Sequence, residues 1–184
     1  MRWQRLTCRR SGGRGFSILQ GRERLMEDRK KAEGRIVWET AAPQDTYDLG
    51  KQFGEKAQPG QVYCLDGDLG VGKTVFAQGF AAGLGITEPV NSPTFTIVQQ
   101  YGGGRLPLYH FDVYRIGSAE EMDEIGYEDC FYGDGVCLIE WSELIEGILP
   151  KQAVRVRMEK DLGQGFDYRR ITAEGIAAMA GQQE

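Results

Sequence analysis

The chain has 184 residues, 41% of them hydrophobic and 27% charged, and its net charge is −5, a balance typical of one globular domain with a sizeable core. No apolar run approaches the length of about 18 residues that a membrane span requires. The four cysteines show no CxxC spacing and the chain has one histidine, which argues against a zinc site or a disulfide framework and favours reduced thiols.

Charge is divided unevenly along the chain. Residues 1–25 contain seven arginines and one glutamate, a net +6, so the remainder carries −11. Three interpretations of this basic segment stay open: a nucleic-acid-binding arm, a targeting peptide, and a disordered extension or upstream start with Met26 as the true first residue. We favour the last, and expect a basic extension over residues 1–30 and a single domain over residues 31–184.

The first half of this domain alternates strands and helices. A short strand is predicted over residues 35–40 and a helix over residues 45–57, with Asp45 as its capping candidate. After a Pro-Gly turn, the apolar run at residues 61–66 predicts a buried strand, and a second helix is predicted over residues 73–85.

The second half is richer in strands. Residues 94–101 and 105–116 flank three glycines and predict a hairpin, and residues 118–131 predict a helix capped by Ser118. The remaining strands are expected at residues 135–141, 153–160 and 166–174, the last two as an antiparallel pair. Strands separated by helices predict an α/β fold, a mixed sheet flanked by helices in three layers.

The segment GDLGVGKT, from Gly67 to Thr74, matches the phosphate-binding pattern G-x-x-x-x-G-K-[ST] between a predicted strand and a predicted helix. Glycines let backbone N–H groups approach a phosphate closely, and the helix points its positive dipole end at the same anion. Lys73 supplies a positive charge for the β and γ phosphates, and the Thr74 hydroxyl is a ligand for Mg²⁺. We therefore predict a P-loop NTPase-like domain. Its nucleotide-binding residues from this stretch are Gly67, Asp68, Leu69, Gly70, Val71, Gly72, Lys73, Thr74 and Val75.

A magnesium ion on such a loop needs an acidic partner at the end of a neighbouring buried strand. Asp112 follows LPLYHF and Glu140 follows GVCLI, so both meet the pattern. The run before Glu140 is purely apolar and predicts a central parallel strand, whereas the run before Asp112 contains Pro107 and follows the hairpin. We assign Glu140 to magnesium. Asp112 is then a candidate for orienting the attacking water or for the metal's outer shell, with a structural ion pair, for example to Arg115, as the alternative.

Three further features lie near these motifs. The segment NSPTFT at residues 91–96, in which Pro93 defines a turn, is either a sensor of the γ phosphate or a plain junction between loop and strand. Trp141 either stacks on a base, covers the site or belongs to the core. His110 is interpreted as a strand residue with a satisfied ring and not as a catalytic group.

Together, GDLGVGKT, SPTFTIVQQY, YHFDVYRI, EEMDEIGYEDCF and CLIEW, followed by GILP, resemble in order and spacing the TsaE family, formerly called YjeE. The resemblance spans residues 36–160 and leaves the basic segment outside. It implies a small cytoplasmic P-loop ATPase of tRNA threonylcarbamoyladenosine biosynthesis, which binds ATP and Mg²⁺ and hydrolyses ATP slowly. It also implies a TsaB–TsaD heterodimer as partner, which modifies the adenosine next to the anticodon, so that contact with tRNA is indirect.

Carried over by position, the resemblance implies site residues as well. Thr74 and Glu140 would hold Mg²⁺, and Thr46 and Trp141 would frame the adenine. The catalytic residues that it implies are Lys73, Asp112 and Thr94.

Two other functions stay open. A nucleotide-sensing assembly factor would need the same loop but little hydrolysis, because its nucleotide state would control partner binding. A small-molecule kinase would need a lid with several arginines, and only Arg105 and Arg115 lie between the loop and Pro150. No catalytic arginine is evident, and Arg115 is the nearest candidate in cis.

Overall fold

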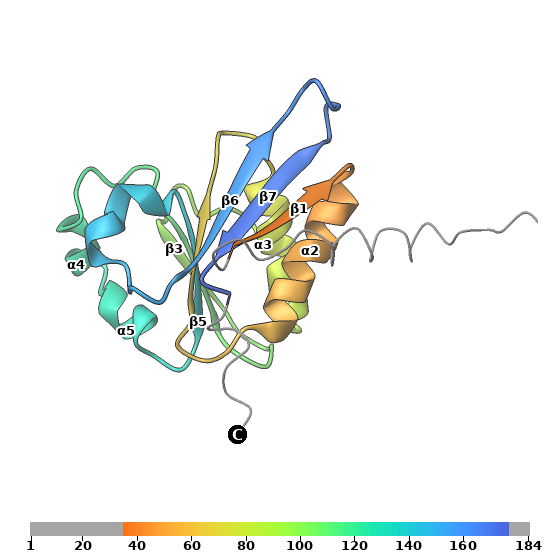
Figure 1. Ribbon diagram of the computed structural model, residues 1–184. Helices are drawn as coiled ribbons and strands as arrows, with labels where there is room; N and C mark the ends of the chain where they lie inside the picture. The colour runs from red at the N-terminus through yellow and green to blue at the C-terminus, as the bar shows by residue number, and fades with distance from the viewer. Residues whose placement is uncertain (1–34, 177–184) are drawn as a thin grey trace, which may run out of the picture. The chain divides into compact units, whose positions relative to one another are not determined.

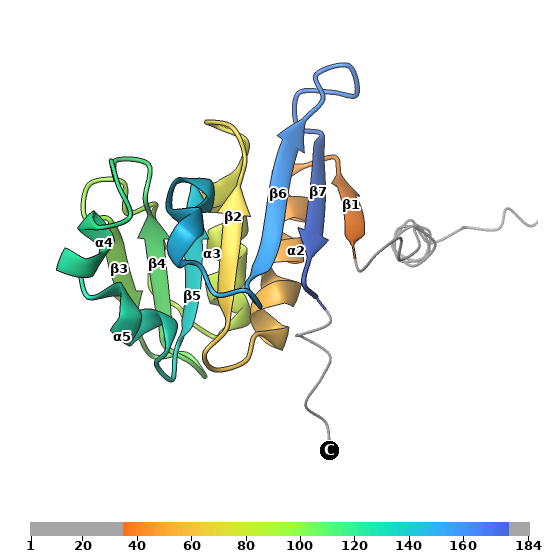
Figure 2. The same ribbon diagram turned by 60° about the vertical axis from the view of Figure 1, so that its left-hand side comes forward.

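The computed structural model describes residues 35–176, so the basic extension predicted over residues 1–30 lies outside the described part. Seven strands form one sheet, with helices packed against it (Figure 1). The strand order is β1-β7-β6-β2-β5-β4-β3 (Figure 2). Their bounds are β1 Ile36–Thr40, β2 Val62–Asp66, β3 Val98–Tyr101, β4 Leu108–Asp112, β5 Val136–Glu140, β6 Val154–Lys160 and β7 Arg169–Glu174.

The centre of the sheet is parallel and its flanks are antiparallel. Strands β6, β2, β5 and β4 run in one direction. Antiparallel pairing joins β3 to β4 and β7 to β6, and β1 pairs antiparallel with β7. The apolar runs of β2 and β5 are buried on both faces, as central parallel strands require. Because parallel strands end at one edge, the segments that follow β2, β4, β5 and β6 gather along that edge (Figure 2).

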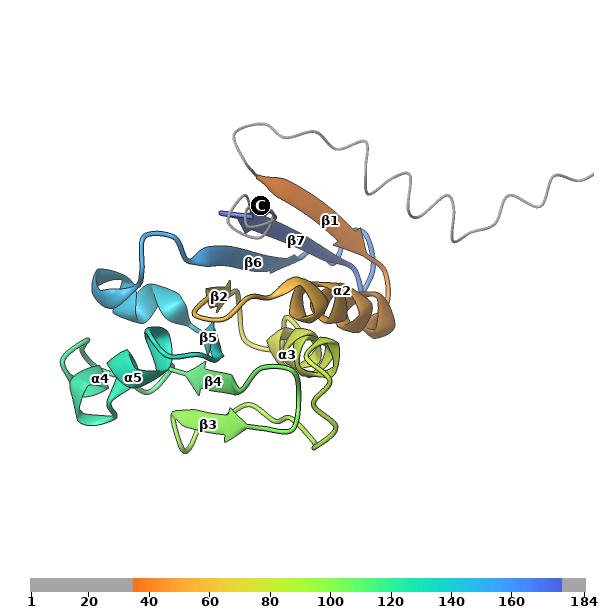
Figure 3. The same cartoon turned by 90° about the horizontal axis from the view of Figure 1, so that it is seen from below.

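Helices cover both faces of the sheet (Figure 3). Helices α2 (Pro43–Lys56) and α3 (Lys73–Gly83) lie on one face, and α4 (Glu121–Glu124), α5 (Tyr127–Phe131) and the 3₁₀ helix η1 (Ser142–Ile148) on the other. Successive strand residues point to opposite faces, so Leu138 joins the core cluster under α2 and α3, and Ile139 the cluster under α5. The predicted three-layer α/β fold is confirmed. None of the helices within residues 35–176 has the length and hydropathy of a membrane span.

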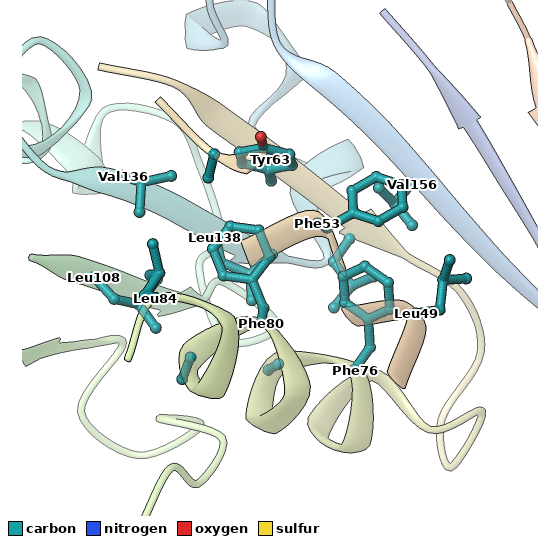
Figure 4. Packing of buried hydrophobic residues seen from close by; sticks show 14 of the residues in the cluster. Leu49, Phe53, Tyr63, Phe76, Phe80, Leu84, Leu108, Val136, Leu138 and Val156 are labelled. Atoms are coloured by element: carbon teal, nitrogen blue, oxygen red, sulfur yellow. The ribbon is translucent and has the colours of Figure 1, made fainter. Parts of the chain in front are cut away.

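Aromatic side chains fill the centre of the larger cluster (Figure 4). The rings of Phe53 on α2 and Phe76 on α3 lie 5.5 Å apart between centroids, and those of Tyr63 on β2 and Phe80 on α3 lie 4.9 Å apart. Both pairs are edge-to-face, the arrangement that the ring quadrupoles favour. These contacts fix α3 on the sheet.

Glycines let α2 and α3 pack backbone against backbone. The contact is formed by Gly50, Gly54, Gly79 and Gly83. A Cβ atom added at Gly79 would overlap the carbonyl oxygen of Tyr47, and one added at Gly54 would overlap that of Phe80. The helices therefore meet at a distance that no side chain at these positions permits.

The helix predicted over residues 118–131 is wrong, because the structure forms two short helices, α4 and α5. Gly126 lies between them with φ of 65°, the left-handed conformation at which helices commonly end. Ser118 is not the N-cap: Glu120 occupies that position, and the Glu121 carboxylate accepts a hydrogen bond from the Gly117 N–H. The sequence pattern missed the break because a glycine within a helical pattern is compatible with either outcome.

Helix α2 begins two residues before the predicted start. Its first residue is Pro43, and the Asp45 carboxylate accepts hydrogen bonds from the N–H groups of Ala41 and Ala42, both at 3.1 Å. Asp45 thus caps the helix from within its first turn, and does not precede it.

We expect Gly79→Ala to lower the free energy of unfolding by about 1–3 kcal/mol, because the added methyl group must push the backbones of α2 and α3 apart. Urea denaturation measures the change. Gly147→Ala is the matched control, since a Cβ atom there meets no neighbour within 4 Å. Equal stability of Gly79→Ala and wild type would show that the helices separate at no cost.

Candidate active site

The glycine loop, residues Gly67–Thr74, joins the end of β2 to the start of α3, as predicted. Gly67, Gly70 and Gly72 have φ values of 144°, 68° and 106°, which residues with a side chain rarely adopt. Gly72 is the N-cap of α3, so the unpaired N–H groups of the first helical turn lie at the loop. A loop of backbone donors at a helix N-terminus is suited to bind an anion.

Lys73 folds back over the loop. Its Nζ donates to the carbonyl oxygens of Gly67, at 2.7 Å, and Asp68, at 3.2 Å, and lies 3.8 Å from the centroid of the Trp141 ring. Burial lowers the pKa of Lys73, and the nearby carboxylates, of which Glu140 acts most strongly, oppose that shift. The ammonium group is thus held inside the loop, where the phosphate-binding pattern requires a positive charge.

Glu140 ends β5 next to this loop. It is in register with Leu65 on β2 and with Asp112 on β4. Its side chain is buried, and its Oε1 lies 3.1 Å from Nε2 of His110. Within the described residues, this is the only hydrogen bond that the Glu140 carboxylate makes.

Asp112 is buried and hydrogen-bonded to the NSPTFT segment. Its Oδ2 accepts hydrogen bonds from Ser92 Oγ and Thr94 Oγ1, both at 2.6 Å, and its Oδ1 accepts one from the Tyr114 N–H at 3.1 Å. Among residues 35–176 no ion pair joins Asp112 to Arg115, whose guanidinium lies over an aromatic ring 4.3 Å away. The ion-pair alternative is therefore wrong, and the structure links Asp112 to Thr94 directly.

The segment before β3 is a turn, not the strand predicted from residue 94. The Pro93 carbonyl accepts hydrogen bonds from the N–H groups of Thr96 and Ile97, at 3.0 and 2.8 Å. Ile97 has φ of 65°, so the strand begins at Val98. The strand propensity of residues 94–97 is overridden because the turn brings two hydroxyls to a buried carboxylate.

The donors around the loop fit a magnesium ion held together with a nucleotide. Mg²⁺ prefers oxygen ligands and, in phosphate sites, binds one or two carboxylates plus phosphate oxygens. Both oxygens of Asp112 already accept hydrogen bonds from the protein, whereas Glu140 leaves Oε2 without a donor from the described residues. The Thr74 hydroxyl likewise makes no hydrogen bond within residues 35–176. This contrast supports the predicted ligand pair.

The two residues expected to frame adenine have different surroundings. Thr46 is buried on α2, with its Oγ1 3.0 Å from Oγ1 of Thr40. Trp141 has φ of 63° and packs its ring on Tyr114, with centroids 5.0 Å apart, as well as on Lys73. The sequence left three roles open for Trp141: stacking on a base, covering the site, or a place in the core. Its contact with Lys73 favours the second, in which the ring covers the site. The framing of adenine by Thr46 stays a prediction.

Two cations that the sequence analysis did not single out hold the glycine loop from the β6–β7 side. Lys160 Nζ donates to the Leu69 carbonyl oxygen at 3.0 Å, and Arg169 Nε donates to that of Val71 at 2.6 Å. These residues are 91 and 98 positions away from the carbonyls they bind. No local pattern could have found them, because the contact depends on β6 lying next to β2.

Comparison with known proteins decides the family. The family model described as "Threonylcarbamoyl adenosine biosynthesis protein TsaE" matches residues 40–171. This chain belongs to the TsaE family. Two relatives carry the name tRNA threonylcarbamoyladenosine biosynthesis protein TsaE. The one from Bacillus subtilis is 47% identical over 142 residues, 77% of this chain and 87% of the relative. The one from Treponema pallidum is 47% identical over 115 residues, 62% and 84% of the two chains.

A solved structure agrees with this assignment. The crystal structure of YdiB from Bacillus subtilis matches with a TM-score of 0.68 and 41% identity, and the match covers 79% of this chain and 89% of that one. The range matched by the TsaE model contains the glycine loop, Asp112 and Glu140. The resemblance predicted from the sequence motifs is therefore confirmed, and with it the P-loop character of this member of the TsaE family.

We expect Asp112→Asn to lower the free energy of unfolding by about 1–3 kcal/mol. In either orientation of the amide, its NH₂ group would replace a carboxylate oxygen that accepts hydrogen bonds, either from the Ser92 and Thr94 hydroxyls or from the Tyr114 N–H. Urea denaturation at neutral pH measures the change. Thr94→Val removes one hydroxyl only and is the matched control, with an expected loss of about 1 kcal/mol. An Asp112→Asn protein as stable as wild type would show that these hydrogen bonds add no stability.

Proposed function

We propose that this TsaE-family chain binds ATP with Mg²⁺ and hydrolyses it slowly, in support of threonylcarbamoyladenosine formation in tRNA. One observation carries the proposal: Lys73 and Thr74 begin α3 at the edge of the sheet where Glu140 and Asp112 end β5 and β4. Phosphoryl transfer needs a cation for the developing charge, oxygen ligands for magnesium and a group that orients the nucleophile. These four residues supply that set.

Each group has a defined task in this proposal. On ATP binding, Lys73 would exchange two loop carbonyls for β and γ phosphate oxygens. Thr74 and Glu140 would hold Mg²⁺, which when bound neutralises charge on the same phosphate oxygens. Asp112, held by Thr94, would orient the water for in-line attack on the γ phosphate.

The placement of arginines supports slow turnover by the isolated chain. Arg115 lies over the ring of Phe95, and Arg105 binds the carbonyl of Gly54 at the end of α2, at 2.5 Å. Both arginines between the loop and Pro150 thus have other partners. An arginine supplied to the γ phosphate raises kcat by about 10³–10⁵ in related NTPases. A partner protein that completes the site would then control the rate.

We further propose the TsaB–TsaD heterodimer as that partner. The relatives are named for threonylcarbamoyladenosine biosynthesis, which supports a place in the same pathway. The chain would reach tRNA through this complex and would act in the cytoplasm, where tRNA is modified.

We expect Lys73→Ala to abolish ATP hydrolysis, because the γ phosphate loses the charge that compensates it in the transition state. Turnover is measured with and without TsaB–TsaD and tRNA, and the complex should stimulate the wild type but not the variant. The exposed Lys151, in the turn before β6, provides the control Lys151→Ala with unchanged turnover. A wild type that neither binds nor responds to TsaB–TsaD would refute the proposed partner.

We expect Glu140→Gln to raise the Mg²⁺ concentration for half-maximal nucleotide binding by more than about tenfold, because a neutral amide replaces the charged ligand. Titration of Mg²⁺ against a fixed concentration of a non-hydrolysable ATP analogue measures this shift. Glu143→Gln alters an exposed carboxylate on η1 and should leave the midpoint in place. An unshifted midpoint in Glu140→Gln would remove Glu140 from the metal site.

A further inference from the structure

His110, the chain's only histidine, lies inside the sheet next to Glu140. Its side chain is completely buried. Nε2 is bonded to Glu140, but Nδ1 is buried without a hydrogen-bond partner in the described part of the chain, so the ring is only half satisfied. Burying a polar group without a partner costs free energy, and an apolar residue at this position would avoid that cost.

The pleat of the sheet places His110 on the side of the reacting groups. Alternate residues of a strand share a face, so His110 and Asp112 of β4 point to the same side. Leu138 and Glu140 of β5 share that side as well, and Leu138 packs in the cluster under α3. His110 therefore lies two residues before Asp112 along β4, on the face of the sheet that α2 and α3 cover.

The chemistry of the pair fixes the direction of its hydrogen bond. An ionised carboxylate only accepts hydrogen bonds, so Nε2 of His110 donates to Oε1 of Glu140 across the observed 3.1 Å. Nδ1 has no hydrogen-bond partner among the described residues. The bond immobilises one carboxylate oxygen and leaves Oε2 of Glu140 without a donor from the described residues.

We propose that His110 is a positioning residue, which holds the Glu140 carboxylate in the orientation that binds Mg²⁺·ATP. The inference rests on the proposed function, since it takes Glu140 as the metal ligand. Metal-binding side chains are commonly oriented by a second hydrogen-bonded group, and loss of that group typically weakens metal binding about 10–100-fold. Glu140 has no other hydrogen-bond partner among residues 35–176, so His110 alone would do this here.

Two substitutions at His110 separate its hydrogen bond from its volume. His110→Leu fills the space without a donor, and His110→Gln restores an N–H donor. We expect His110→Leu to raise the Mg²⁺ concentration for half-maximal binding of a non-hydrolysable ATP analogue about 10–100-fold, and His110→Gln to recover most of that loss. Phe111→Leu, at the next and equally buried residue of β4, is the packing control and should leave the midpoint unchanged.

The single histidine allows a second readout that needs no variant. In tag-free protein labelled with ¹⁵N-histidine, we expect one imidazole signal set, with the proton on Nε2. The signal should shift when Mg²⁺ is added to the protein with the ATP analogue, and stay in place when Mg²⁺ is added alone. If His110→Leu does not fold, this measurement decides the question.

Each outcome has one meaning. A folded His110→Leu protein with the wild-type Mg²⁺ midpoint overturns the inference, and so does a ring protonated on Nδ1 alone or unmoved by Mg²⁺ with the ATP analogue. If Glu140→Gln also leaves the midpoint unchanged, it is the metal assignment of the proposed function that has failed. If only Glu140→Gln shifts the midpoint, the proposed function stands and His110 serves packing alone.

Discussion

Parallel pairing of β2, β5 and β4 holds the candidate site residues of this chain at one level. Leu65, at the end of β2, is in register with Glu140, and Glu140 is in register with Asp112. The side-chain period of a strand is two residues, so a shift of one residue would turn each acid to the opposite face of the sheet. Because both faces of the central strands are buried, such a shift would also disrupt both core clusters. The register of the core thus fixes the geometry of the site.

The other half of the site depends on where α3 begins. The glycine contacts with α2 and the aromatic contacts with Tyr63 fix the axis of this helix, and Lys73 and Thr74 are its first two residues. Packing far from the nucleotide edge therefore positions the groups that would bind phosphate and magnesium. The same packing buries Lys73, which lowers its pKa, and the nearby carboxylates, of which Glu140 acts most strongly, oppose that shift.

The polar groups buried at this edge differ in how completely they are paired. Both carboxylate oxygens of Asp112 accept hydrogen bonds, whereas only one oxygen of Glu140 does. Of the two ring nitrogens of His110, only Nε2 has a hydrogen-bond partner among the described residues. A buried polar group without a partner costs free energy, so incomplete pairing is expected where a ligand supplies the missing contact. The number of hydrogen-bonded carboxylate oxygens thus distinguishes Asp112, the water-orienting candidate, from Glu140, the metal-binding candidate. It could not be read from the sequence, in which both acids end similar apolar runs.

The sequence by itself determined the phosphate-binding pattern and the fold class. A contiguous loop of eight residues carries the phosphate-binding pattern, and apolar runs with glycine turns determine the alternation of strands and helices, because these signals are local.

Only the tertiary structure decided which groups act together. Ser92 and Thr94 reach Asp112 across 20 and 18 residues, His110 reaches Glu140 across 30, and Lys160 and Arg169 reach the loop across more than 90. The turn at Pro93 was predicted, but the break at Gly126 and the late start of β3 at Val98 were missed. Local propensity yields at these points to packing against the sheet and to a buried carboxylate. Contacts of this range arise from strand order and register, which no local pattern encodes.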